Sequence, residues 1–447
     1  MEKKVIDSNL PYDLFMKHCK ELPEVLGGKK RLNLEQSFIE YERAKEFIPG
    51  GICGARGPEN YVCGEYPIYI KSGKNGHCID LDGNEFIDFM CGYGPVTLGY
   101  AIPEIDEPVK KQIDNGFCFT IPQKLQNDLA QKLKEIIPCA EKSVFGKSGT
   151  DAVVAAIKVA RAYTKKEYIV TSGYHGWTDE IMAGPDGGAL KATREYTKWL
   201  AYGDFDGYER VVKNGNVAAI LISTKTGGPS QGIVYDVDFI KKLRKLADEN
   251  DVLLIFDEIR NGFRYGFDGG MSEIGVIPDL AVFGKGLANG YPISALCGRA
   301  DIMDVCAKEH TDEGAYISST FFVNTMEMIA ALKTIEYYEE HDVLKNMKKK
   351  TDYYNNKIDE IIEKYDAPML NTGYGAQPAF SFDRNAMSED MFAARTITLF
   401  AYIIRSGILI HPWRQQYFMF SHTQEDIDKS LQALDEGLAV TRERYPW

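Results

Sequence analysis

Two charged side chains near the middle of the chain each follow a short apolar run. Asp257 follows the run from Val252 to Phe256. Lys285 follows the run from Leu280 to Phe283. Short apolar runs bounded by chain breakers are typical of strands buried on both faces of a parallel sheet. Ligands of such sheets bind beyond the carboxyl ends of the strands, so we expect the acid and the amine to face one ligand.

The chemistry that this pair offers is Schiff-base formation with an aldehyde. A neutral lysine amine is a nucleophile, and Lys285 lies between Gly284 and Gly286, which leave room for an adduct. An acid that pairs with a ring nitrogen, together with such a lysine, is the signature of pyridoxal phosphate sites. Each residue alone has an ordinary alternative, because a lysine after a strand is commonly solvated and an acid there commonly caps the next helix.

A possible phosphate site follows the apolar run Ser143–Phe145. Ser148, Gly149 and Thr150 stand there at the start of a helix rich in alanine and valine. Backbone N–H groups and the dipole at a helix N-terminus attract anions, and the two hydroxyls can donate hydrogen bonds. The segment lacks the Lys-Ser/Thr ending of a Walker loop, and the chain has no G-x-G-x-x-G after a strand for a nicotinamide site. The same residues are also compatible with a plain helix cap.

Two further groups extend this pattern. Tyr174 and His175 lie between glycines directly after the run Tyr168–Thr171, where an aromatic ring can lie flat against a heterocycle. Ser318 to Thr320 place hydroxyls in a loop before a long helix. Turn aromatics that pack on the protein face are the alternative for the first group. Together the groups supply a phosphate site, a stacking ring, a nitrogen partner and a Schiff-base lysine on one sheet edge.

The elements that must position these residues alternate between strand and helix. This alternation predicts an α/β fold with a mostly parallel, doubly wound sheet. Helical periodicity marks 151–163, 238–247 and 326–340. The expected strands are Ser143–Phe145, Tyr168–Thr171, Val217–Ile222, Val252–Phe256 and Leu280–Phe283.

The two ends of the chain have a different pattern of strands and helices from this central part, and together they predict a smaller α+β domain. We expect a large cofactor-binding domain over 91–330, with the smaller domain built from 34–90 and 331–447, and an N-terminal extension over 1–33. Gly27 to Arg31 is interpreted as a surface connector. The smaller domain is expected to contain a helix over 34–47, a strand meander over 68–90 with an Asp-Gly turn, helices over 352–365, 391–406 and 423–442, and strands over 407–410 and 417–420.

Composition excludes several classes of function. The net charge of −13 gives no basic footprint for nucleic acid. No apolar run approaches the length of a membrane span or a signal peptide, so we expect no membrane partner. The nine cysteines are scattered, without the spacing of a metal site, so no metal is expected. An odd cysteine count and the lack of a signal favour a reducing cytoplasm.

With these motifs in chain order, the sequence resembles the class III pyridoxal-phosphate aminotransferases of fold type I, in the branch of the glutamate-1-semialdehyde aminomutases. The resemblance covers nearly everything from about Leu34 to the C-terminus. The matching motifs include Pro49-Gly50-Gly51, Asp80-Leu81-Asp82-Gly83-Asn84, Ser148-Gly149-Thr150-Asp151-Ala152, Tyr174-His175-Gly176, Phe256-Asp257-Glu258-Ile259, Gly262-Phe263-Arg264 and Gly284-Lys285.

The resemblance implies a role for each matched residue. Lys285 would hold the cofactor as a Schiff base and then move the proton, and Asp257 would pair with the ring nitrogen. Tyr174 would stack on one ring face and Ile259 would pack on the other. Thr320 would reach the phosphate of a neighbouring subunit, which implies a homodimer with a shared site. The full set of expected cofactor contacts is Ser148, Gly149, Thr150, Tyr174, His175, Asp257, Ile259, Lys285 and Thr320.

The chain departs from the family pattern at three places, two beside the cofactor and one in the substrate pocket. Lys147 replaces the usual Asn before Ser-Gly-Thr, and Ser223-Thr224 replaces the usual Glu-Pro. Where aminomutases have a pocket glutamate, this chain has a segment from His411 to Tyr417 that contains a base. An anionic substrate is therefore expected, since a bidentate arginine suits a carboxylate. The substrate candidates are Arg56, Tyr93, Trp413 and Arg414; surface positions for the arginines and core packing for the rings are the alternatives.

The leading hypothesis is a dimeric aminotransferase that acts in ping-pong fashion through Lys285. Its donor would be a β- or ω-amino acid, an amine or an anionic derivative such as a β-aminoacyl thioester, and its acceptor a 2-oxo acid or aldehyde. The alternative is an isomerase on the same scaffold, either a 2,1-aminomutase or an amino-acid racemase. A non-catalytic binding protein is disfavoured by the presence of both Lys285 and Asp257.

Overall fold

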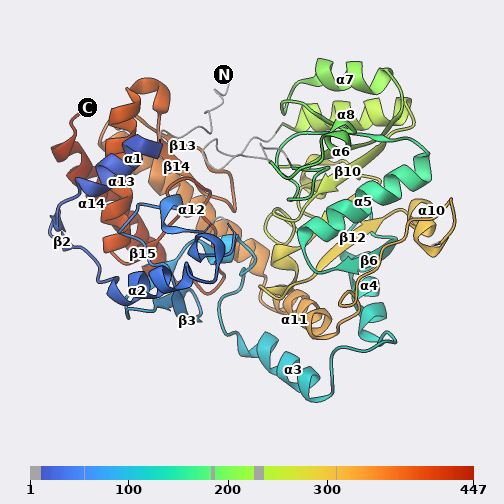
Figure 1. Cartoon of the computed structure of the whole chain (residues 1–447), viewed down its shortest axis with the longest axis horizontal. Coiled ribbons are helices and arrows are strands. Elements are labelled where there is room, and N and C mark those ends of the chain that lie inside the picture. The colour runs from blue at the N-terminus through green and yellow to red at the C-terminus, as the bar shows by residue number, and fades with distance from the viewer. Residues whose placement is uncertain (1–11, 55, 183–186, 226–235, 309) are drawn as a thin grey trace.

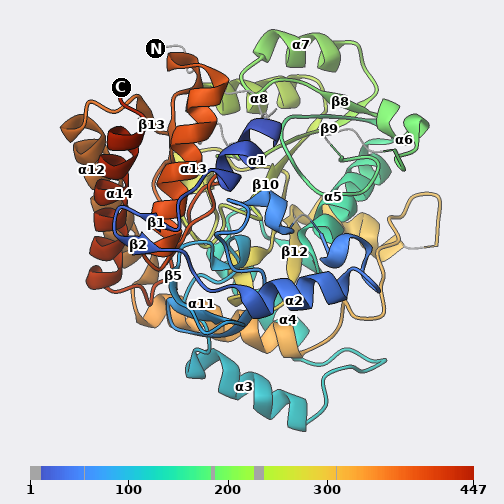
Figure 2. The ribbon, with the colours of Figure 1, turned by 60° about the vertical axis from the view of Figure 1, so that its left-hand side comes forward.

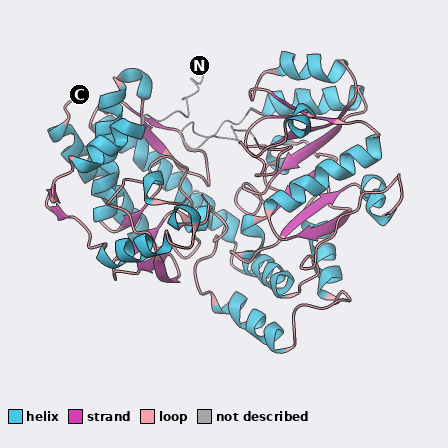
Figure 3. Cartoon of the chain, in the orientation of Figure 1, coloured by secondary structure: helices cyan, strands magenta, loops and turns pink. Residues whose placement is uncertain are grey.

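The computed structural model describes residues 12–54, 56–182, 187–225, 236–308 and 310–447. Figure 1 shows two lobes, and the first and last described helices, α1 and α14, lie in the same one. The other lobe holds the central part of the sequence, coloured green to yellow. Figure 3 shows that helices enclose the strands of this second, larger lobe. The expected domain boundaries after residues 33, 90 and 330 stay predictions.

The larger lobe is built on a seven-stranded sheet with the order β6-β12-β11-β10-β9-β7-β8. The neighbours from β11 to β8 pair in parallel, in agreement with the mostly parallel sheet that was predicted, although β8 was not expected as a strand. The exception is β12, which runs antiparallel to both β11 and β6 and was not expected as a strand. The strands are β6 (Lys142–Gly146), β7 (Tyr168–Thr171), β8 (Thr197–Trp199), β9 (Val217–Ile222), β10 (Leu253–Asp257), β11 (Leu280–Phe283) and β12 (Ser294–Gly298).

Helices cover this sheet on both faces, which explains why its strands lack an apolar–polar alternation. In β10 every residue is buried, and successive side chains point to opposite faces. Leu253 and Ile255 join one core cluster with helix α5 (Gly149–Thr164). Leu254 and Phe256 join the other, with helix α8 (Val237–Glu249). The remaining helices of this lobe are α3 (Pro103–Asp114), α4 (Leu125–Ile136), α6 (Lys191–Glu195), α7 (Phe205–Lys213), α9 (Met271–Ile274), α10 (Ala300–Met303) and α11 (Met326–Glu340).

The smaller lobe joins segments that are far apart in the sequence. Its four-stranded sheet has the order β15-β5-β4-β3, and β15 (Ile408–Leu409) pairs in parallel with β5 (Glu85–Asp88). The Asp-Gly turn was correctly expected between β4 (His77–Asp80) and β5, which pair antiparallel. The other elements are β3 (Ile70–Lys74), α2 (Glu35–Ala44), α12 (Val343–Lys364), α13 (Glu389–Arg405), α14 (Gln424–Arg444) and a hairpin of β13 (Met369–Asn371) and β14 (Phe380–Phe382).

Two expectations for this lobe were wrong. Residues 417–420 form no strand, because Tyr417 and Phe420 each donate one backbone hydrogen bond, to Phe89 and Thr97 respectively, instead of a continuous ladder. The supposed surface connector is a hairpin of β1 (Val25–Leu26) and β2 (Lys29–Lys30). Together with helix α1 (Tyr12–Lys20) it packs on α13, and Figure 2 shows α1 beside α13.

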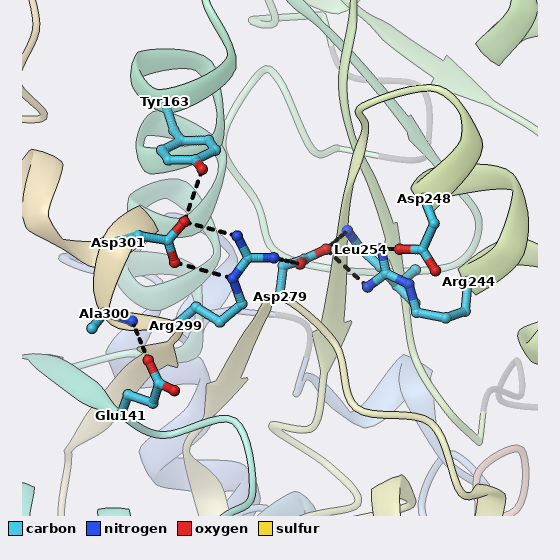
Figure 4. A network of polar contacts seen from close by, with 9 residues as sticks. All are labelled: Glu141, Tyr163, Arg244, Asp248, Leu254, Asp279, Arg299, Ala300 and Asp301. Carbon is cyan, nitrogen blue, oxygen red and sulfur yellow. Dashed lines mark hydrogen bonds and ion pairs between the residues drawn. The ribbon is translucent and has the colours of Figure 1, made fainter.

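The buried carboxylate of Asp279 connects neighbouring elements of the sheet at the edge opposite to Asp257 and Lys285. Asp279, before β11, accepts hydrogen bonds of 2.8 Å from Arg244, Arg299 and the backbone N–H of Leu254 (Figure 4). It is 5% exposed, so its charge is removed from water and compensated by two guanidinium groups. Asp279 therefore connects α8, β10 and the segment after β12.

We expect Asp279→Ala to lower the free energy of unfolding by about 2–4 kcal/mol, because two arginines and a buried N–H lose their acceptor. Urea unfolding followed by circular dichroism would measure this loss. The matched control is Asp301→Ala, which removes an exposed partner of Arg299 and should cost about 1 kcal/mol or less. Equal losses in the two variants would contradict a special role for Asp279.

Candidate active site

The ends of β10 and β11 bring the predicted acid and lysine to one edge of the sheet. Asp257 ends β10 and lies opposite Val282 in the parallel register, and Lys285 follows β11 by two residues. Lys285 has a φ of 40°, in the left-handed region that is uncommon for residues other than glycine. Burial and the positive charge of Arg260 lower the pKa of Lys285 to about 8, although Asp257 opposes this shift. A larger fraction of the amine is therefore neutral near pH 7 than in water, as a nucleophile requires.

Asp257 is oriented by the turn that follows β7. It is 6% exposed, and its Oδ2 lies 2.6 Å from Nδ1 of His175. The other ring nitrogen of His175 donates to the carbonyl of Ser172 at 2.8 Å, which fixes the ring. The backbone N–H of Ile259 donates to Oδ1 of Asp257 at 3.1 Å. The carboxylate is thus held on both oxygens, at the strand end where a ring nitrogen is expected.

The start of α5 offers its first N–H groups for a phosphate. Ser148 is the N-cap, and its hydroxyl exchanges hydrogen bonds with Asp151 in a capping box. Its side chain is therefore engaged in the helix cap, which matches the alternative noted from the sequence. The backbone N–H groups of Gly149 and Thr150 stand at the first two helical positions, where no intrahelical acceptor exists. These amides and the Thr150 hydroxyl are the donors best placed for a phosphate.

One wall of the site consists of Ile259 packed between two glycines. A Cβ on Gly149 would lie 2.7 Å from the Ile259 Cδ1 atom, and one on Gly284 would lie 3.5 Å from its Cγ2 atom. Glycine at position 149 thus lets the helix start approach Ile259. Tyr174, the predicted stacking ring, is 69% exposed in the single chain, and Thr320 is also exposed. The roles of these residues stay predictions.

The side chains of Arg56 and Arg414, two of the predicted substrate residues, lie against the ring of a third, Tyr93. The guanidinium carbons of Arg56 and Arg414 are 5.3 and 4.8 Å from the ring centroid of Tyr93. Neither guanidinium has an acidic partner among the described residues. The two cations therefore share one aromatic ring without a neutralising carboxylate, an arrangement that suits an anionic ligand.

Two residues beside Tyr93 were not found from the sequence. The hydroxyl of Tyr61 lies 2.5 Å from that of Tyr93, and the ring of buried His411 lies 4.9 Å from Tyr61 and 5.8 Å from Tyr93. Burial and the charge of Arg414 lower the pKa of His411 well below its ordinary value, so the imidazole is neutral. Tyr61 lies in an irregular loop without periodicity, so nothing in the sequence connected it with His411.

The residues that depart from the family pattern contact neighbouring side chains in the structure. Lys147 pairs with buried Glu327 of α11 at 3.1 Å, which draws its charge toward that helix. Thr224 donates to Glu258 at 2.6 Å behind Asp257, and burial raises the pKa of Glu258 to about 8. Trp413 packs against Phe15 with ring centroids 4.5 Å apart, so core packing, the alternative noted above, accounts for part of its surface.

The comparison with protein families decides the identity of this site. The model of the class-III aminotransferases matches residues 61–438, a span that contains the ends of β10 and β11 and the start of α5. The chain belongs to the class-III aminotransferase family.

Individual relatives of this class-III aminotransferase agree with that assignment. It is 38% identical to the 3-aminobutyryl-CoA aminotransferase of Cloacimonas acidaminovorans (strain Evry), over 92% of this chain and 99% of the relative. It is 30% identical to the glutamate-1-semialdehyde 2,1-aminomutase of Fusobacterium nucleatum subsp. nucleatum, over 90% and 96% of the two chains. The FumI protein of Sphingopyxis sp. MTA144, solved in its PLP internal aldimine form, superposes with a TM-score of 0.84 at 26% identity, over 91% and 97%.

The enzyme is thus a pyridoxal-phosphate-dependent aminotransferase of fold type I, and its residues fit this cofactor. Lys285, with its lowered pKa, suits the aldehyde of the cofactor, and the oriented Asp257 suits the ring nitrogen. The α5 amides suit the phosphate, and Ile259 suits one face of the ring. Among the described residues no helix is long and apolar enough to cross a membrane. The same part of the chain contains no group of three or more His, Cys, Asp or Glu side chains that could hold a metal ion.

The pKa of Lys285 predicts how cofactor attachment depends on pH. Only the neutral amine reacts, so attachment to the apoenzyme should speed up as pH rises toward the pKa of about 8, by about tenfold per unit, and level off above it. Visible absorbance after mixing apoenzyme with pyridoxal phosphate would measure this rate. Arg260→Gln should move the midpoint to higher pH, because a positive charge that favours the neutral amine is lost.

Lys285→Ala is the control for this experiment. It should develop no visible absorbance that borohydride removes, whereas the wild-type enzyme should. An attachment rate that stays flat between about pH 6 and 9 would contradict the lowered pKa.

Proposed function

We propose that this enzyme transfers the amino group of a β-amino compound, with a β-aminoacyl thioester such as 3-aminobutyryl-CoA as the first candidate, to a 2-oxo acid. The observation that most supports the β-amino donor is the 38% identity to a 3-aminobutyryl-CoA aminotransferase over nearly the full length of both chains. The Arg56–Tyr93–Arg414 stack supports an anionic acceptor. A free β-amino acid, an ω-amino acid or a simple amine are the other donors to test.

Two substrates must use the same site in turn, and the arginines suit the second of them. A thioester donor has no carboxylate next to its reacting end, whereas a 2-oxo acid always carries one. A planar guanidinium binds a carboxylate through two parallel hydrogen bonds. The ring of Tyr93 lies against both Arg56 and Arg414 and supports them without neutralising their charge.

The chain's own residues supply attachment, orientation and proton transfer. Bound pyridoxal phosphate supplies an electron sink for the bond that breaks at the amino-bearing carbon. Asp257, held by His175, keeps the ring nitrogen protonated and so maintains that sink. The Lys285 amine would act as the base that takes the proton from the amino-bearing carbon of the substrate, and then as the acid that gives it up. Its lowered pKa favours both acceptance and release of a proton near neutrality.

The isomerase alternative shares this machinery and is supported by the 30% identical aminomutase. The segment of the site from His411 to Arg414 favours transfer, since it places a guanidinium and a neutral imidazole beside Tyr93. An aminomutase of this branch is expected to have a carboxylate in this segment. We therefore keep the aminomutase, and with it an amino-acid racemase, as the second candidate.

A donor panel separates these functions. Wild-type holoenzyme would be incubated with 3-aminobutyryl-CoA, 3-aminobutyrate, β-alanine and a simple ω-amine, each with pyruvate or 2-oxoglutarate. We expect alanine or glutamate to form, with the highest kcat/KM for the thioester. Isomerisation of glutamate-1-semialdehyde without amino transfer to any acceptor would establish the aminomutase instead, and racemisation of an amino acid would establish the racemase.

The role of Arg414 can be tested separately. Arg414→Gln should raise KM for 2-oxoglutarate by about 10- to 100-fold, as expected when a hydrogen bond to a charged group is lost. Steady-state kinetics with the acceptor varied would measure the change. Arg43→Gln is the matched control, because Arg43 is exposed and pairs with Glu40 on α2. An unchanged KM in Arg414→Gln would place carboxylate binding elsewhere.

We also propose that the enzyme works in the cytoplasm as a homodimer in which each subunit completes the site of the other. The exposure of Thr320 and Phe321 supports this, because a loop with hydroxyls and an aromatic ring lies uncovered in the single chain. In this arrangement Thr320 donates to the phosphate held by the partner subunit.

Subunit mixing tests the shared site. Lys285→Ala and Thr320→Asp homodimers should each have little activity, the second because a carboxylate would repel the phosphate. Co-expression of the two variants should restore activity, since the hybrid contains one site with both native residues. Recovery of at least several per cent of wild-type activity is expected, and no recovery in a purified hybrid would contradict the shared site.

A further inference from the structure

Residues 12–33, called the N-terminal segment below, have no part in the function proposed above, yet they are firmly attached to the smaller lobe. Glu65 and Arg405 are buried and joined by two hydrogen bonds of 2.7 Å. Arg405 also donates to the carbonyls of Pro23 and Glu24 at 3.0 and 3.1 Å. A buried guanidinium with all these acceptors is rigid. The chain between α1 and β2 is thereby fixed to α13.

Close packing fixes the same segment from the other side. A Cβ on Gly27, at the turn between β1 and β2, would lie 2.3 Å from the side chain of Val440 in α14. On α1, His18 is buried and contacts Asp390 at the start of α13 at 3.1 Å. Figures 1 and 2 both show α1 alongside α13. The N-terminal segment is therefore an integral layer of the smaller lobe.

One aromatic ring of this layer contacts the segment that carries the proposed substrate residues. Phe15 of α1 is 6% exposed, and its centroid lies 6.2 Å from Phe392 in α13 and 4.5 Å from Trp413. The contact with Trp413 is edge-to-face, with an angle of 62° between the rings. Aromatic pairs prefer this geometry. Phe15 thus connects α13 to the segment that carries the proposed substrate residues.

Trp413 stands between two residues that contact Tyr93. Its backbone N–H donates to Nδ1 of His411 at 3.1 Å, and the next residue, Arg414, lies over the Tyr93 ring at 4.8 Å. Residues 411–423 belong to no helix or strand, so no backbone ladder fixes this turn. The Nε2 atom of His411 is buried without a partner among the described residues. Backbone hydrogen bonds from Gln416 and Tyr417 fix the end of this segment, and side-chain packing on Trp413 adds a constraint on where His411 and Arg414 lie.

We propose that Phe15 is a positioning residue for substrate recognition, which acts through Trp413 to hold His411 and Arg414 against Tyr93. The inference rests on the substrate role proposed for Arg414. The match to the class-III model begins at residue 61, after this segment. Phe15 therefore adds a determinant of specificity from a part of the chain that does not define the family.

Kinetics of the holoenzyme test this role. Phe15→Ala should raise KM for 2-oxoglutarate about three- to tenfold, the range expected from losing one aromatic pair, and leave kcat within about twofold. Phe15→Leu keeps the apolar volume and should fold well, yet it should also raise KM, because the edge-to-face contact is lost. Glutarate, which binds without reacting, gives a second readout: its Kd, measured by calorimetry, should rise by the same factor.

The control is His18→Ala, which loosens α1 at its contacts with Asp390 and Glu21. It should lower stability without changing KM or the glutarate Kd. In a Trp413→Ala background, Phe15→Ala should have no further effect on KM, since the two residues act in series. The inference is overturned if Phe15→Ala and Phe15→Leu keep wild-type values, if His18→Ala has an equal effect, or if the effects of Phe15 and Trp413 simply add.

Absence of amino transfer in the wild-type enzyme would contradict the proposed function, while the glutarate measurement would still test Phe15.

Discussion

In the larger lobe β10 and β11 pair in parallel, with Asp257 opposite Val282 and Lys285 two residues beyond β11. This one register brings a carboxylate and an amine to the same edge of the sheet. A shift by one residue would turn every side chain of a strand to the other face and separate the pair. The register is held at the far edge by Asp279, whose carboxylate binds the N–H of Leu254 and two arginines.

Charge is distributed very unevenly in this enzyme. The chain as a whole is strongly acidic, yet Arg260, Arg264 and Arg414 all contribute to the lowered pKa of Lys285. Asp257 opposes them and is itself held by His175. The local excess of positive charge lowers the pKa of the amine, and it is the same charge to which we assign the proposed anionic substrate.

The strands of the larger lobe could be predicted because both faces of the sheet are covered, which leaves continuous apolar runs in the sequence. The prediction failed where tertiary contacts replace local patterns. β12 was missed since Ser294–Gly298 is short and contains serine and glycine, and its antiparallel pairing depends on neighbours on both sides. Residues 417–420 form a short apolar run, as a buried strand does, but their hydrogen bonds go singly to two different segments.

The N-terminal segment illustrates the same limit. Its composition is polar and charged, so nothing local indicated that Phe15, Cys19, Leu22 and Leu26 are buried. Burial there depends on α13 and α14, which follow more than three hundred residues later. The ion pair of Glu65 and Arg405 completes the contact of the N-terminal segment with α13. A pattern of apolar residues in the sequence cannot reveal this pair, because both side chains are charged.

The sequence by itself determined the family and the cofactor and singled out Lys285 and Asp257 as the predicted catalytic pair, because each motif is a short local signal at a strand end. Only the tertiary structure decided what surrounds them: the His175–Asp257 hydrogen bond, the use of Ser148 as a helix cap, the arginines on Tyr93, and the contact of Phe15 with Trp413. Apart from the Ser148 cap, these contacts join residues from distant parts of the chain. Their geometry depends on the tertiary fold, which no local spacing encodes.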